Sequence, residues 1–191
     1  LLASVAAAGN EAPRIPWSTG GHEGRNQMLE LGGAYSLPGL GRGHLRLTPW
    51  HSRIPGAAGF GVALNLDQEL GSPIRSDRTS TGRRAHTRSI GFVRAGVGET
   101  AVTPVQTFVS AGITLEQPFG RPRDEMALGI AWSRPSPGVG QRNETLIEAY
   151  YRVALSPALS LTPDVQVVMD PTLNPAARDS VVLGLRLHLN L

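Results

Sequence analysis

The clearest indication of the fold is the last stretch of the chain, Val181-Val182-Leu183-Gly184-Leu185-Arg186-Leu187-His188-Leu189-Asn190-Leu191. Every odd-numbered residue in it is apolar, and the even-numbered residues are small or polar except for Val182. Successive side chains of an extended strand point to opposite faces. The stretch therefore predicts a β-strand with one apolar face and one mostly polar face.

The same alternation recurs upstream. Residues 161–169 place Leu161, Val165, Val167 and Met169 on one face, and Pro163, which lies among them, is expected to weaken the strand pairing locally. Further alternating segments lie at 145–155, 126–132, 109–115, 93–97, 62–66, 45–50 and 29–35, with 1–8 as an additional candidate. Clusters of Gly, Pro, Asn and Asp separate them. The sequence thus predicts about ten antiparallel strands, roughly nineteen residues for each strand and its turn.

Composition removes several classes of function. The 191 residues include no Cys, and all 18 basic residues are Arg, so thiol chemistry, thiolate metal sites and lysine-dependent catalysis are excluded for this chain. No apolar run is long enough for a transmembrane helix. The five His residues show no ligand spacing, and we expect no metal and no cofactor.

The positive charge is concentrated in one stretch. Five of the arginines lie between Gly71 and Ser89, and the rest of the chain is close to neutral. This stretch lacks the interleaved aromatic residues of a nucleic-acid site, so we interpret it as a solvated loop and expect no nucleic-acid partner.

Two architectures use many alternating strands, the soluble β-sandwich and the outer-membrane β-barrel. Aromatic residues make up only 5% of the chain, and the polar faces carry Gly, Ser, Asn, Gln, Arg and Glu, which suits a wet lumen better than a solvent face over an aromatic core. A tight turn at 156–158 lies between longer connections at 135–142 and 170–179. Alternating short and long connections favour the transmembrane barrel.

Several ordered motifs carry a family likeness. The runs 148–152, 155–157, 161–166 and 179–187, together with Asn174-Pro175, resemble the C-terminal end of the bacterial carbohydrate-selective porins. Residues 61–70 and 118–124 are similar to earlier strands and turns of that family, so the resemblance covers about 27–191. It departs from the family at Leu191, where the last strand usually finishes on an aromatic residue that the barrel assembly machinery recognises.

The resemblance implies an all-β outer-membrane barrel of about sixteen antiparallel strands that passes sugars by facilitated diffusion, without catalysis or cofactor. At the spacing seen here, sixteen strands need roughly 300 residues. We therefore expect residues 1–191 to form a single partial barrel domain, with an N-terminal part of the barrel outside it. Counting strands backwards from a periplasmic C-terminus places the stretch 71–89 on the periplasmic side, where turns are normally short.

Strand alternation also selects candidate pore-lining residues. Those that project to the polar face and could hydrogen-bond a sugar, or in the case of Tyr150 stack on one, are Arg94, Glu116, Glu148, Tyr150, Arg152, Asp164, Gln166 and Arg186. Trp50 and Trp132 are interpreted as lipid-facing residues of an aromatic girdle. The expected partners are sugars as solutes, outer-membrane lipid and the barrel assembly machinery, and the oligomeric state is left open.

Two alternatives stay open at this point. One is a ten-strand barrel closed on itself that acts as an outer-membrane enzyme or adhesin, which a cluster of acidic and His residues at the loop end would favour. The other is a soluble β-sandwich binding module, which solubility without detergent would favour.

Overall fold

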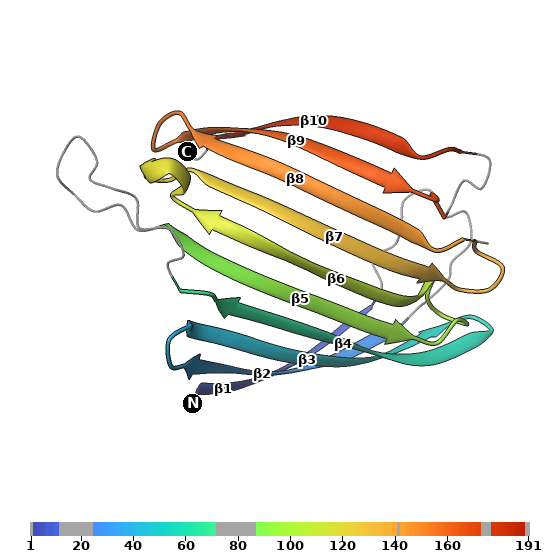
Figure 1. Ribbon diagram of the computed structural model, residues 1–191. Helices are drawn as coiled ribbons and strands as arrows, with labels where there is room; N and C mark the ends of the chain where they lie inside the picture. Colours follow the sequence, from blue (N-terminus) through green and yellow to red (C-terminus); the bar gives the residue numbers. More distant parts are fainter. Residues whose placement is uncertain (1, 12–24, 72–86, 141, 173–176, 190–191) are drawn as a thin grey trace.

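The computed structural model describes residues 2–11, 25–71, 87–140, 142–172 and 177–189. It contains one ten-stranded antiparallel sheet, as the alternation predicts (Figure 1). The strands are β1 (Leu2–Glu11), β2 (Arg25–Leu37), β3 (Gly41–Ile54), β4 (Ala57–Glu69), β5 (Arg88–Gly98), β6 (Val105–Glu116), β7 (Glu125–Pro135), β8 (Glu144–Ala154), β9 (Leu159–Met169) and β10 (Ser180–Leu189), with a short 3₁₀ turn, η1 (Pro118–Gly120), between β6 and β7.

Each strand pairs with its neighbours in the sequence, from β1 to β10 without a crossover. Within the described residues, β1 pairs only with β2 and β10 only with β9, so this sheet is not closed on itself. The ten-strand self-closed barrel is therefore not the arrangement found. None of the described residues forms a helix long and apolar enough to cross a membrane.

The sheet has no dry core. Among the described residues from 25 onward no hydrophobic side chain is buried, and the buried side chains are small or polar, such as Ser89, Ser110 and Ser136. By contrast, Leu183 is 80% exposed and Leu185 is 69% exposed on the apolar face of β10. A soluble sandwich would bury these residues between two sheets, so the sandwich interpretation is wrong. An apolar face without protein cover is the arrangement that lipid requires.

Aromatic residues on this apolar face, which we call the outer face, lie near the two ends of the strands. Tyr35 and Tyr151 lie close to the ends of β2 and β8. Phe60 and Trp132 lie toward the opposite end of the sheet, in β4 and β7. Phe119 of η1 is highly exposed, and its ring centroid is 6.3 Å from that of Tyr151. Two aromatic girdles that flank an apolar band are typical of outer-membrane barrels.

Trp132 has the predicted orientation, but the prediction for Trp50 is wrong. Trp50 is opposite Gly61 and shares the polar face with Arg46. Its indole lies over Gly61 and Gly98, where an added Cβ on Gly98 would be 2.8 Å from indole Cζ2. Two glycines side by side thus provide the room for this large ring on the polar face.

Proline interrupts the strand pairing where the sequence predicts it. The β8–β9 pairing runs as far as Tyr150↔Asp164 and resumes at Val153↔Leu161, and Pro163 lies in the gap. Pro49 of β3 lies in a similar gap in the β2–β3 pairing. Proline has no backbone N–H to donate across the sheet, which accounts for both gaps.

The connections form two sets (Figure 1). The connections at 38–40, 117–124 and 155–158 lie at one end of the sheet, and so do the end of β4 and the start of β5. Residues 72–86 lie outside the described part, so the periplasmic position of the Arg-rich stretch 71–89 stays a prediction. Arg88 is a correction to the solvated-loop interpretation, because it is the first residue of β5 and is paired with β6.

The turn between β6 and β7 is fastened to β8 by Asp124, whose side chain is 1% exposed. Its Oδ1 accepts a hydrogen bond from the Ala154 N–H at 2.9 Å, and its Oδ2 accepts one from the Tyr151 hydroxyl at 2.8 Å. Arg121 Nε lies 2.7 Å from the same Oδ2. A buried carboxylate with three donors from two segments holds η1 against the end of β8.

Candidate functional site

The polar face of the sheet holds all eight predicted residues. Strand register explains why: Glu148 is opposite Gln166, and Tyr150 is opposite Asp164, so side chains of neighbouring strands fall in rows on the same face. A hollow of about 390 Å³ opens on this face between β4 and β8. Of the predicted residues, the hollow is lined by Arg94, Glu116, Glu148 and Tyr150, while Arg152, Asp164, Gln166 and Arg186 lie beside it on β8, β9 and β10.

Arg186 links three strands beside the hollow. Its Nη2 lies 3.2 Å from Glu148 Oε1, and its Nε lies 3.2 Å from Asp164 Oδ2. Gln166 Nε2 donates to the same Glu148 oxygen at 3.4 Å. The Arg186 guanidinium also lies 5.8 Å from the centroid of the Tyr150 ring. Four of the predicted residues therefore surround one arginine.

Gly184 makes room for this arrangement. It is opposite Asp164, and an added Cβ would meet the carboxylate of Asp164. The carboxylate lies over the glycine with its side chain only 6% exposed, and there it accepts the hydrogen bond from Arg186.

Glu125 contacts two of the predicted residues of β8, Tyr150 and Arg152. The Tyr150 hydroxyl donates to Glu125 Oε1 at 2.6 Å, and Arg152 Nη2 donates to Glu125 Oε2 at 2.9 Å. One carboxylate thus holds the Tyr150 ring, which lines the hollow, next to the Arg152 guanidinium, which lies beside it.

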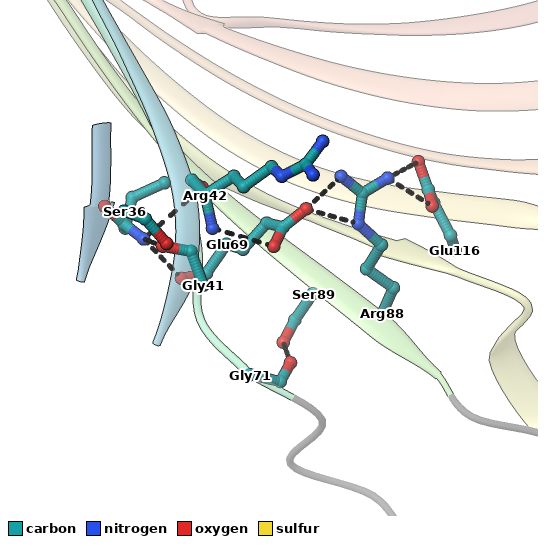
Figure 2. A network of polar contacts seen from close by, with 9 residues as sticks. Ser36, Gly41, Arg42, Glu69, Gly71, Arg88, Ser89 and Glu116 are labelled. Carbon is teal, nitrogen blue, oxygen red and sulfur yellow. Dashed lines mark hydrogen bonds and ion pairs between the residues drawn. The ribbon is translucent and has the colours of Figure 1, made fainter. Parts of the chain in front are cut away.

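A second network lies at the end of the sheet where 70–87 joins (Figure 2). Arg88 forms ion pairs with Glu69 and with Glu116, the latter at 3.1 Å. Glu69 Oε2 also accepts a hydrogen bond from the Arg42 N–H at 2.9 Å. The hydroxyl of Ser89 donates to the carbonyl of Gly71 at 3.0 Å. The contacts of Arg88 and Glu69 tie β3, β4, β5 and β6 together on the polar face, whereas Ser89 is on the opposite face of β5.

Arg94 has a different environment. The ring of Phe92 lies over two glycines of the neighbouring strands, because an added Cβ on Gly112 would be 2.6 Å from the ring and one on Gly129 would be 3.6 Å from it. The Arg94 guanidinium lies above this ring, 4.9 Å from its centroid. No ion pair of the described strands includes Arg94.

Sequence reasoning missed five residues of this face: Asp67, Glu69, Arg88, Phe92 and Glu125. Asp67 directly follows the predicted segment 62–66 and Phe92 directly precedes the predicted segment 93–97, so the alternation extended by one residue places both on the polar face. Glu125 directly precedes the predicted segment 126–132, and the same alternation extended by one residue places it on the polar face.

The site offers hydrogen-bonding groups without an obvious catalytic set. Its carboxylates and guanidinium groups occur in pairs, which hydrate the wall and can donate to or accept from hydroxyl groups. Within the described residues, no cluster of three or more His, Asp or Glu side chains could hold a metal ion. The arrangement suits recognition of a polar, uncharged or weakly charged solute at a wetted wall.

Comparison with known proteins gives a family match. Residues 30–191 match the model of the "Carbohydrate-selective porin, OprB family". Porin AaxA of Chlamydia pneumoniae is 27% identical over 130 residues, which is 64% of this chain and 30% of that protein. Porin AaxA of Chlamydia abortus is 28% identical over 136 residues, 68% of this chain and 27% of that protein.

The fold also matches a solved structure. A structure of Pseudomonas putida OprB at high pH superposes with a TM-score of 0.70 and 19% sequence identity, covering 87% of this chain and 48% of that one. The chain thus spans about half the length of that structure and under a third of each Chlamydia porin. At 19% identity the structural match supports the fold alone. The family match over residues 30–191 shows the family.

Proposed function

Since the chain belongs to the carbohydrate-selective porin family, OprB, whose members are proteins of the bacterial outer membrane, we propose that it forms part of the wall of a pore for passive diffusion of carbohydrates. The family and the fold are those of a channel rather than an enzyme. Residues 1–191 would act as one partial barrel domain within a barrel of about sixteen strands.

The single observation that supports this proposal best is the contrast between the two faces of one sheet. The outer face carries exposed apolar residues such as Leu183 and Leu185, with aromatic residues toward both ends. The polar face carries ion pairs such as Arg186–Glu148 around a hollow. Lipid outside and water inside would satisfy both faces at once.

The pore-lining role of the eight predicted residues is part of the proposal. Hydroxyl groups of a sugar would donate to carboxylates such as Glu148 and accept from guanidinium groups such as Arg152. Tyr150 presents a ring beside Arg186, and an aromatic face can pack against the apolar side of a sugar ring. The partners would be sugars, outer-membrane lipid and the barrel assembly machinery.

The experiment is solute uptake into liposomes that contain the full-length protein. We expect hexoses to enter much faster than they enter empty liposomes, and disaccharides to enter more slowly than hexoses. Uptake no faster than in empty liposomes, from a protein shown to be folded and inserted, would contradict the proposal. A variant that combines Glu148→Gln with Arg152→Gln tests the polar face, because it removes one negative and one positive charge while both positions keep a polar side chain, and we expect it to slow hexose entry.

A further inference from the structure

Each carboxylate that lines the hollow between β4 and β8 has an arginine partner. The four pairs are Asp67 with Arg46 at 3.7 Å, Glu116 with Arg88 at 3.1 Å, Glu125 with Arg152 at 2.9 Å, and Glu148 with Arg186 at 3.2 Å. Two of these arginines are shared, since Arg88 also pairs with Glu69 and Arg186 also pairs with Asp164, so the paired groups include two more carboxylates than arginines.

Arg94 is the exception among the described residues that line the hollow. It takes part in no ion pair there, and the residues directly opposite it on both neighbouring strands, Asn65 and Ser110, are neutral. Its guanidinium is exposed and lies over Phe92 at 4.9 Å. Arg94 is therefore the one charged residue lining the hollow that has no ion-pair partner in the described strands.

Phe92 helps to hold the Arg94 guanidinium in place. Its ring lies over Gly112 and Gly129, which have no side chains that would occupy the space under the ring. Cation–π attraction keeps a guanidinium near such a ring. Arg94 thus presents a planar fork of donors toward the hollow, and a planar fork matches the two oxygens of a carboxylate.

We propose that Arg94 is a specificity-determining residue that selects sugars carrying a carboxylate, such as aldonates and uronates, over neutral sugars of the same size. This inference rests on the proposed function and deepens it. The carboxylate would bind at Arg94, and the hydroxyl groups would reach the paired groups around it, such as Glu125 with Tyr150.

The test compares entry of gluconate and of glucose into liposomes that contain the full-length protein. One charge pair at about 5 Å in a water-like medium favours the anion by about four-fold. We expect the ratio of gluconate to glucose entry to fall by that factor in Arg94→Gln, to fall less in Arg94→Lys, and to stay unchanged in Arg53→Gln. Arg53 is an exposed arginine near one end of β3, outside the hollow, and its replacement removes the same charge.

The outcomes separate this inference from the proposed function. Entry of glucose with an unchanged ratio in Arg94→Gln would overturn the role of Arg94 and leave the pore standing. An equal fall in Arg53→Gln would overturn it too, since net charge alone would then explain the preference. If neither solute enters through the unaltered protein, the pore itself is refuted and the inference with it.

Discussion

Among the carboxylates at the end of the sheet that carries η1, Asp124 is expected to cost the most folding stability when it is replaced. Replacement by Asn in Asp124→Asn keeps the shape but removes the charge and turns one acceptor into a donor. The side chain is 1% exposed and accepts from the Ala154 N–H at 2.9 Å and the Tyr151 hydroxyl at 2.8 Å, with Arg121 at 2.7 Å. The amide cannot accept from donors on both sides.

The size of the effect follows from these contacts. A hydrogen bond to a charged group contributes about 1.5–3 kcal/mol, and one such bond is lost outright while the other is weakened. The ion pair adds little, because Arg121 is 56% exposed and solvent screens it. We therefore expect Asp124→Asn to lower the free energy of unfolding by about 2–4 kcal/mol.

The assay is equilibrium unfolding in urea from lipid vesicles, followed by tryptophan fluorescence. Asp170→Asn is the matched control, since Asp170 is 57% exposed and its 3.2 Å pair with Arg142 lies in solvent. That control should lose less than about 1 kcal/mol. Equal losses in the two variants would refute the anchoring role of Asp124.

Three further predictions concern the sheet and its polar face. Pro163→Val should raise the free energy of unfolding by about 1 kcal/mol, because it restores a backbone donor in the β8–β9 gap; a loss in urea unfolding would contradict this. Leu185→Arg should cost about 2–4 kcal/mol on the outer face, whereas Val182→Arg on the polar face should cost less than about 1 kcal/mol, and equal costs would contradict the assignment of faces. Glu148→Gln should shift the reversal potential in a salt gradient toward anion selectivity, because it frees part of the charge of Arg186; an unchanged potential would contradict it.

The strands were predictable because alternation is a direct consequence of strand geometry. The segments around Leu183 and Val165 each correspond to an observed strand, and the chain-order pairing follows from their short connections. The ends of the strands were less predictable. The predicted segment 45–50 is only the middle of a strand that runs from Gly41 to Ile54. The residues at the two ends of this strand do not alternate cleanly between apolar and polar, so the alternation did not reveal them.

The facing of the site residues was predictable, whereas their partners were not. Alternation places Asp164 and Arg186 on one face, but their contact depends on the register of β9 with β10 and on the missing side chain of Gly184. The prediction that Trp50 faces lipid was wrong for a related reason, because the position of its ring depends on glycines of two other strands. The prediction that Arg88 lies in a solvated loop was wrong, because five arginines in one stretch are typical of a loop, whereas the last of them begins β5.

The assignment of the outer face to lipid and of the polar face to water is tested most directly by spin labels along β10. The described chain has no Cys, so single cysteines can be introduced in the full-length protein at each position from Val182 to His188 except Gly184, where a side chain would meet Asp164. In lipid vesicles, labels at 183, 185 and 187 should respond to oxygen dissolved in the bilayer, and labels at 182, 186 and 188 to a water-soluble relaxation agent. Equal response of both sets to the water-soluble agent, or the reverse alternation, would contradict the assignment.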